Sequence, residues 1–332
     1  WETVGQGSLT VVTSQSLRES TVNLARNGIA LEALRQQLPF QSDVPLPNRR
    51  CLRYGPHGIH EYRGKFFPQL VRSLINISGA VPGGIVADPM SGSGTTAVET
   101  VLAGCRSLEI DMNPLSVFLG RVKCQLLSAD AETLAASYGQ LHDELLAPKK
   151  RKAKRLDYLE SLPKADQEYL SSWFSKDVLA ELDHISLAIG RIADKHARNL
   201  MLTSLSNILR SVSWQKDDDL RVRKEIRPDF EADPTKEFLQ ELNRSTRSVL
   251  AFLYQNGPVR KSAFEILEGD AKQCGETWGE KSIDLVITSP PYATALPYLD
   301  TDRLSLCYLG LLPRPEHRVR DSFMIGNREV SE

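Results

Sequence analysis

The segment from residue 80 to residue 111 constrains the fold of this chain more than any other. Residues 85–88 form an apolar run that ends in an aspartate, and a loop rich in glycine, serine and threonine follows. Apolar residues then recur with helical spacing up to Gly104, a residue type that commonly ends helices. Residues 107–111 repeat the apolar run that ends in aspartate. A strand, a helix and a strand with such short connections predict a βαβ unit and a parallel sheet.

The alternation of strands and helices resumes only after a long interruption. From about residue 129 to residue 253 the apolar residues keep helical spacing, which predicts a large helical insertion. Two more strands are predicted at 264–267 and 283–288. We therefore expect an α/β fold with a doubly wound, Rossmann-like sheet. Such sheets usually contain more than four strands, and the others are expected from residues 1–50, from sequence after residue 332 or from another polypeptide.

The loop between the first strand and its helix has the composition of a nucleotide-binding turn. Gly92, Gly94 and Ala97 fit the pattern G-x-G-x-x-A, in which glycines allow a tight turn and the close approach of a ligand. No lysine precedes the threonine pair, so the loop is not of the phosphate-binding Walker type. Asp88 at the loop entrance would repel a pyrophosphate and suits a ligand with ammonium and sulfonium charges. This favours S-adenosylmethionine over NAD; the alternative is a glycine turn that serves packing alone.

Asp111 ends the next strand, where a carboxylate accepts hydrogen bonds from ribose hydroxyls. The residues expected to bind the cofactor on these grounds are Asp88, Pro89, Ser91, Gly92, Ser93, Gly94, Thr95, Thr96 and Asp111.

The tetrapeptide Ser289-Pro290-Pro291-Tyr292 follows the last predicted strand. In a sheet of order 3-2-1-4 the first and fourth strands are neighbours, so this tetrapeptide and the glycine loop are expected to line one cleft. Two prolines fix the backbone and remove two N–H donors. The Ser289 hydroxyl and the Pro290 carbonyl can then accept the hydrogens of a base amine, while Tyr292 offers a flat face to an extruded base. These four residues are the predicted catalytic residues; the alternative is a rigid proline turn with a packing tyrosine.

Together these motifs resemble the family of S-adenosylmethionine-dependent DNA amino-methyltransferases, over about residues 57–120 and 263–310. The resemblance implies that Asp270, in Gly269-Asp270-Ala271, contacts the cofactor's adenine amine. It also implies that the stretch His60–Pro68, which contains Phe66, closes over the methionine moiety. The form Thr-Ser-Pro-Pro-Tyr at 288–292 is typical of enzymes that methylate the N4 atom of cytosine, whereas adenine-specific enzymes more often carry Asp-Pro-Pro-Tyr or Asn-Pro-Pro-Tyr.

The resemblance further implies base flipping and direct in-line methyl transfer at a specific DNA site, with a cognate restriction or defence subunit as a possible partner. It places the methyltransferase domain at 51–128 and 256–332, after an N-terminal segment, 1–50, of undefined structure. The helical insertion, 129–255, is then the candidate region for DNA contact or target recognition.

The net charge of −1 means that any contact with DNA phosphates must come from a local basic surface. The candidates are Lys149, Lys150, Arg151 and Lys152 in the basic run 149–155, together with Arg303. The alternatives are a solvated linker for the run and a surface salt-bridge cluster for Arg303 and its acidic neighbours.

Composition bounds the remaining possibilities. There is no apolar run of about 20 residues and no signal-peptide pattern, so no membrane span is expected. Five scattered cysteines without a C-x-x-C motif predict free thiols in a reducing cytoplasm and no metal site.

Four rival functions stay open at this point. An adenine-N6 DNA methyltransferase differs only in the target base. An RNA guanine-N2 methyltransferase would be favoured by an N-terminal RNA-binding module, which the sequence does not show. An NAD-dependent oxidoreductase would need an acid–base residue at the end of the fourth strand. A non-catalytic DNA-binding subunit would carry a decayed site, which the intact tetrapeptide argues against.

Overall fold

The computed structural model describes residues 54–62, 64, 67–148, 155–216, 223–226, 231–259, 263–291 and 298–325. Within these ranges one parallel sheet has the strand order β3-β2-β1-β4. The strands are β1 (Ile85–Asp88), β2 (Arg106–Asp111), β3 (Phe264–Glu268) and β4 (Leu285–Val286). The predicted α/β fold with a doubly wound, Rossmann-like sheet is confirmed, and β1 and β4 are neighbours as expected. Residues 1–50, which have no predicted structure, lie outside the described ranges.

The strand β4 is shorter than predicted. Only Leu285 and Val286 pair as a strand, against Val86 and Ala87 of β1. One backbone hydrogen bond to β1 flanks the pair on each side, from the N–H of Asp284 and from the N–H of Ile287. The prediction of a strand over 283–288 was therefore too long. Among the described strands β4 lies at the sheet edge, and the prolines that follow Ser289 have no N–H to extend the ladder.

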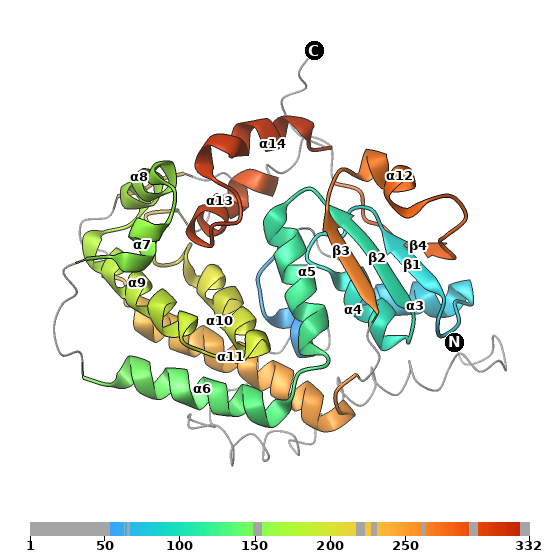
Figure 1. Ribbon diagram of the computed structural model, residues 1–332, viewed down its shortest axis with the longest axis horizontal. Helices are drawn as coiled ribbons and strands as arrows, with labels where there is room; N and C mark the ends of the chain where they lie inside the picture. The colour runs from blue at the N-terminus through green and yellow to red at the C-terminus, as the bar shows by residue number, and fades with distance from the viewer. Residues whose placement is uncertain are drawn as a thin grey trace.

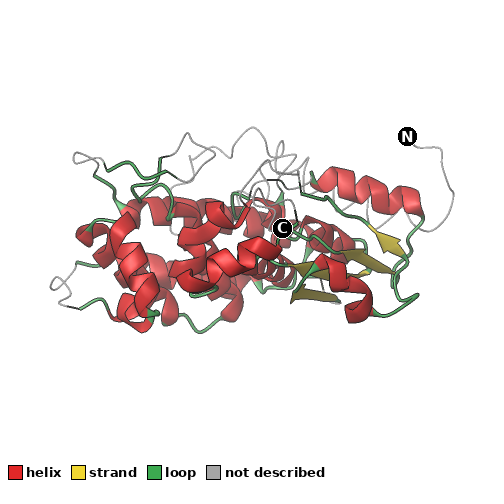
Figure 2. Cartoon of the chain, turned by 90° about the horizontal axis from the view of Figure 1, so that it is seen from above, coloured by secondary structure: helices red, strands yellow, loops and turns green. Residues whose placement is uncertain are grey.

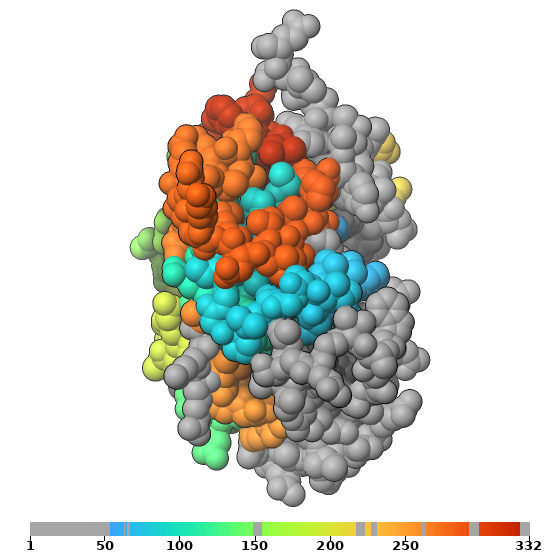
Figure 3. Space-filling model, turned by 90° about the vertical axis from the view of Figure 1, so that its right-hand side faces the viewer, coloured from blue at the N-terminus to red at the C-terminus, as the bar shows by residue number. Residues whose placement is uncertain are grey.

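Three helices cover one face of the sheet: α3 (Pro68–Ser78), α4 (Thr95–Leu102) and α5 (Pro114–Leu126) (Figure 1). Helix α4 ends before Gly104, whose φ of 75° is the left-handed conformation expected at that position. On the other face Val286 stays 53% exposed. Helix α3 also keeps exposed apolar side chains at Leu70, Leu74 and Ile77, and the flanking residues Phe67 and Val81 are exposed as well. Figure 3 views this side of the molecule, where the blue and cyan residues around α3 adjoin the orange residues around β4.

A buried polar cluster joins these helices to the short helix η2 (Gly55–Gly58). The carboxylate of Glu99, on α4, accepts hydrogen bonds from Tyr54, from His57 Nε2 at 2.7 Å and from Arg72 Nε at 2.8 Å. Burial raises the pKa of Glu99, but the charge of Arg72 and the bond from His57 outweigh it, so this pKa is lowered. The cluster therefore fixes the segment that leads to residues 60–62 against α3 and α4.

The helical insertion forms a separate body beside the sheet (Figures 1 and 2). It contains α6 (Ala131–Leu146), α7 (Asp157–Ser161), α8 (Lys164–Trp173), α9 (Lys176–Gly190), α10 (Lys195–Ile208) and α11 (Pro234–Asn256). The side chains of Asp130, Ser175, Asp194 and Asp233 each cap one of these helices. One apolar core fills this body and reaches Val122 and Leu126 of α5, so α5 links it to the sheet.

The described chain ends with α13 (Tyr298–Tyr308), η4 (Arg314–Glu316) and α14 (His317–Phe323). Leu299 and Leu306 of α13 pack with Leu115 and Leu119 of α5. This packing returns the end of the described chain to the carboxyl edge of the sheet. None of the helices in the described ranges has the length and hydropathy of a membrane span.

Candidate active site

A cleft of about 890 Å³, including its open mouth, lies where the strands end at their carboxyl edge. Its lining residues are Tyr62, Gly64, Asp88, Pro89, Met90, Ser91, Gly92, Ser93, Thr95, Asp111, Met112, Gly269, Asp270, Ala271, Ser289, Pro290, Pro291, Met324 and Ile325. The structure thus brings together the loop after β1, the ends of β2 and β3, and the segment after β4. Segments about 200 residues apart in the chain meet because their strands are neighbours.

The glycine loop is held close to helix α5. Gly92 and Gly94 have φ values of 52° and 76°, in the left-handed region that glycine tolerates. A Cβ atom added at Gly94 would lie 2.5 Å from the Cα atom of Gly120, so backbone packs against backbone there. Both glycines are therefore required by the geometry.

Asp88 anchors this loop from within. Its two carboxylate oxygens accept the N–H of Met90 at 3.0 Å and the hydroxyl of Thr96 at 2.8 Å, and the side chain of Thr288 also donates to it. Burial raises its pKa, and these hydrogen bonds oppose the rise. From the sequence we expected Asp88 to meet the ammonium group of a ligand. In the structure its oxygens already hold the loops that follow β1 and β4, although the residue also lines the cleft.

Asp111 is also fixed by backbone donors. Its oxygens accept the N–H of Gly92 and the N–H of Asn113, each at 2.8 Å. Burial, together with the charges of Asp88 and Asp302, raises its pKa to about 7 against the effect of the two donors. Asp302, on α13, accepts a hydrogen bond from Asn113 Nδ2 at 2.8 Å. Asp302 therefore supports the loop that follows Asp111.

A third buried acid lies beside these two. Glu109 pairs in register with Asp88 and accepts a hydrogen bond from Ser107 at 3.0 Å. Burial and the charge of Asp88 raise the pKa of Glu109 well above its usual value. Asp88 and Asp111, the two acids of this group that line the cleft, favour a cationic ligand and oppose a pyrophosphate.

The cleft contains complementary groups for the other parts of S-adenosylmethionine. The hydroxyl of Ser93 is buried and has no hydrogen-bond partner among the described residues, so it is available to a ligand. Ser93 and Thr95 lie at the N-terminus of α4, where unpaired N–H groups favour a carboxylate. Met112, Ala271, Met324 and Ile325 offer apolar surface to a purine. The residues present therefore fit this cofactor.

The other predicted site residues have different positions. Asp270 lines the cleft, and its carboxylate pairs with Lys272 Nζ at 3.1 Å. Ser289, Pro290 and Pro291 line the cleft opposite the glycine loop, whereas Gly94 and Thr96 brace that loop without lining the cleft. Outside the described residues lie Phe66, Tyr292, Lys149, Lys150, Arg151 and Lys152.

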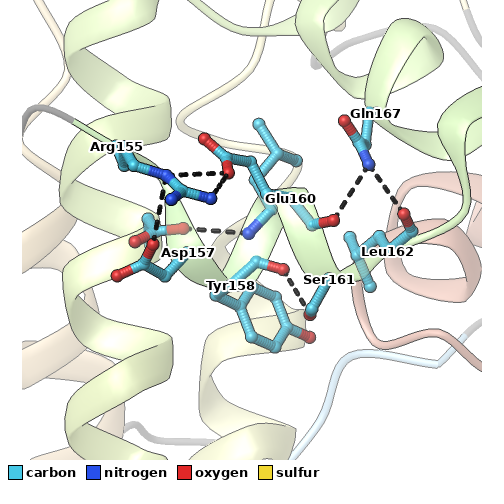
Figure 4. Close-up of polar contacts among 9 residues, drawn as sticks. Arg155, Asp157, Tyr158, Glu160, Ser161, Leu162 and Gln167 are labelled. Carbon is cyan, nitrogen blue, oxygen red and sulfur yellow. Dashed lines mark hydrogen bonds and ion pairs between the residues drawn. The ribbon is translucent and has the colours of Figure 1, made fainter.

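The position of Arg303 does not support a contact with DNA. Its guanidinium pairs with Asp300 at 2.9 Å and lies 5.2 Å from the ring centre of Trp173. Its side chain is only 14% exposed. At the end of the basic run, Arg155 bonds Glu160 and lies 3.7 Å from Asp157, as Figure 4 shows.

Several cleft residues were not predicted. Tyr62 donates to or accepts from Ser116 Oγ at 2.8 Å, and its ring would lie 3.3 Å from a Cβ atom at Gly92. Tyr62 and Gly64 belong to the stretch 60–68, from which only Phe66 was selected. Met112 directly follows Asp111, and Met90 lies two residues after Asp88. Met324 and Ile325 follow α14, and no local sequence pattern marks them.

Comparisons with known proteins agree with this geometry. Residues 60–158 match the family model described as the RMKL-like methyltransferase domain. The chain is 26% identical to the Type II methyltransferase M.MjaII of Methanocaldococcus jannaschii, over 73% of this chain and 60% of the relative. It is 24% identical to the Type II methyltransferase M.MvaI of Kocuria varians, over 82% of this chain and 62% of the relative.

A third relative, the Type II methyltransferase M.BsoBI of Geobacillus stearothermophilus, is 22% identical over 82% of this chain and 57% of the relative. The chain thus spans about three fifths of the length of these relatives. No solved structure matches the chain significantly. By the domain match and these three relatives the chain is similar to methyltransferases, and the sheet with its glycine loop agrees with that similarity.

Proposed function

We propose that this chain carries the catalytic site of a DNA methyltransferase that methylates the N4 amine of cytosine within a specific site. The observation that supports this most is the shared cleft of the glycine loop and Ser289-Pro290-Pro291. A cofactor on the loop after β1 and a base at the segment after β4 would meet across one strand spacing. Thr288-Ser289-Pro290-Pro291-Tyr292 favours cytosine N4, and adenine N6 is the alternative.

On the cofactor side, the proposed roles follow from charge and hydrogen bonding. Asp111 accepts hydrogen bonds from the ribose hydroxyls. The acidic group that includes Asp88 stabilises the ammonium group. The Ser93 hydroxyl and the N–H groups that begin α4 bind the carboxylate. When bound, the cofactor supplies an electrophilic methyl group on its sulfonium sulfur.

On the base side, the Ser289 hydroxyl and the Pro290 carbonyl accept the hydrogens of the amine. This turns the nitrogen lone pair toward the methyl carbon, and Tyr292 stacks on the extruded base. The amine nitrogen would take the methyl group as the carbon–sulfur bond breaks with its electron pair staying on sulfur, and the nitrogen would then release one proton to water. Orientation supplies much of the rate enhancement in such a displacement. The helical body α6–α11 is the proposed region for DNA contact.

The test separates binding from transfer. S-adenosylmethionine binding is measured by calorimetry, and DNA incubated with protein and cofactor is digested to nucleosides for mass spectrometry. We expect N4-methylcytosine from the unaltered protein. Pro290→Ala and Tyr292→Ala should abolish transfer and retain cofactor binding, and Asp111→Ala should weaken cofactor binding. Methylated adenine would replace the cytosine proposal, and failure of the unaltered protein to bind cofactor would refute the whole assignment.

A further inference from the structure

The last described helix brings two apolar residues into the cleft. Helix α14 ends at Phe323, and the next residues, Met324 and Ile325, line the cleft. The N–H of Met324 donates to the carbonyl of Asp321 at 3.1 Å, which closes the helix end. Met324 also packs against the apolar cluster that α5 and α13 share. One wall of the cleft is therefore built from a segment far from the nucleotide-binding motifs.

Arg320 attaches this wall to the sheet. Its Nη1 atom donates to the carbonyl of Met112 at 3.0 Å and forms an ion pair with the carboxylate of Glu268. Met112 directly follows β2, and Glu268 is the last residue of β3. One guanidinium group thus joins α14 to the carboxyl ends of two neighbouring strands. The Arg320 side chain is 26% exposed, so this contact is partly shielded from water.

The wall lies beside the residue expected to bind ribose. Met112 is adjacent to Asp111, and both line the cleft with Met324. Asp111 would accept hydrogen bonds from the hydroxyls of the cofactor's ribose. The purine is attached to the same ribose, so the purine must lie within a few ångströms of the Asp111 carboxylate. Methionine side chains are flexible and polarisable, which suits them to contact a flat ring.

Resting on the proposed function, we propose that Arg320 is a positioning residue for the cofactor's purine. The latch formed by Arg320, Glu268 and the Met112 carbonyl holds Met324 and Ile325 against the adenine ring. Loss of the latch lets this wall move and weakens contacts with the adenosine part of the ligand. The loop that would bind the methionine part, at Ser93 and Thr95, keeps its own anchors, Asp88 and Lys123.

The experiment uses two probes that share adenosine and differ at the other end. S-adenosylhomocysteine carries the amino-acid end, and 5′-methylthioadenosine lacks it. Calorimetry on Arg320→Ala should show both affinities lowered by a similar factor, on the order of tenfold, because the contacts to Glu268 and to the Met112 carbonyl that hold the wall are both lost. Glu268→Gln should act in the same direction, and the double variant should lose less than the product of the two single effects.

Arg106→Ala is the matched control. Arg106 pairs with Glu265 at 3.3 Å, which also joins β2 to β3 but at the end of the strands away from the cleft. It should leave both affinities unchanged. Equal binding by Arg320→Ala and the unaltered protein would refute the proposed role of the latch and would leave the proposed function unaffected. A loss confined to S-adenosylhomocysteine would refute its assignment to the purine. Failure of the unaltered protein to bind either probe would refute the proposed function with it.

Discussion

The contact between Gly94 and Gly120 makes a quantitative prediction for Gly94→Ala. Two costs add in this variant. An alanine with φ near 76° adopts the left-handed conformation, which costs about 1–2 kcal/mol. Its Cβ would also lie 2.5 Å from the Gly120 Cα, a backbone atom that cannot rotate away, and overpacking of this kind typically costs about 1–3 kcal/mol more.

Gly79 provides a control that separates the two costs. It ends α3 with a φ of 75°, and a Cβ there would meet nothing within 4 Å. Gly79→Ala should therefore show the conformational cost alone, about 1–2 kcal/mol. The loss of unfolding free energy in Gly94→Ala should exceed that in Gly79→Ala by the overpacking cost of about 1–3 kcal/mol. Urea unfolding followed by tryptophan fluorescence measures both variants against the unaltered protein.

Cofactor titration extends the comparison to function. Gly94→Ala should lower S-adenosylmethionine affinity, because the loop must shift to relieve the contact, and Gly79→Ala should not. Equal losses of unfolding free energy in the two variants would show that the loop accommodates the added methyl group without cost. That result would contradict the overpacking cost assigned to Gly94→Ala.

Two further predictions concern buried acids. S-adenosylmethionine affinity should rise with pH through about 7, because the pKa of Asp111 is raised to about 7 and its ionised form accepts ribose hydroxyls better; Asp111→Asn should remove this slope in calorimetry. The raised pKa of Asp111 also stabilises the folded protein at pH values below about 4, which is the pKa of an aspartate in the unfolded chain. This contribution is lost as pH rises toward 7. Glu99→Gln should cost about 3–5 kcal/mol in urea unfolding, because it leaves the guanidinium of Arg72 buried without its carboxylate. Glu265→Gln, which breaks the half-exposed pair with Arg106, should cost less than about 1 kcal/mol; similar losses in both would contradict the role of burial.

The features predictable from sequence are those that local patterns encode. The apolar runs that end at Asp88 and Asp111, with glycines between them, determine a βαβ unit. The order of a doubly wound sheet then brings Ser289 to the same cleft. Pro234 begins α11, because a proline is well tolerated in the first helical turn.

The features that were missed depend on contacts across the chain. The bond from Arg320 to Met112 joins residues 208 apart, and no local sequence pattern marks Arg320. Glu109 lies within an apolar strand, and only the register with Asp88 reveals it as part of an acidic group. The engagement of Asp88 with Thr288 likewise requires the two loops to be placed first.

That bond from Thr288 to Asp88 has a mechanical consequence. The Asp88 carboxylate ties the turn after β1 to Thr288, the residue just before Ser289. The cofactor side and the base side of the proposed site are therefore held by the same residue. Neighbouring strands lie about 4.8 Å apart, and both turns start from that spacing. The gap that a methyl group must cross is then set largely when the protein folds, before either reactant arrives.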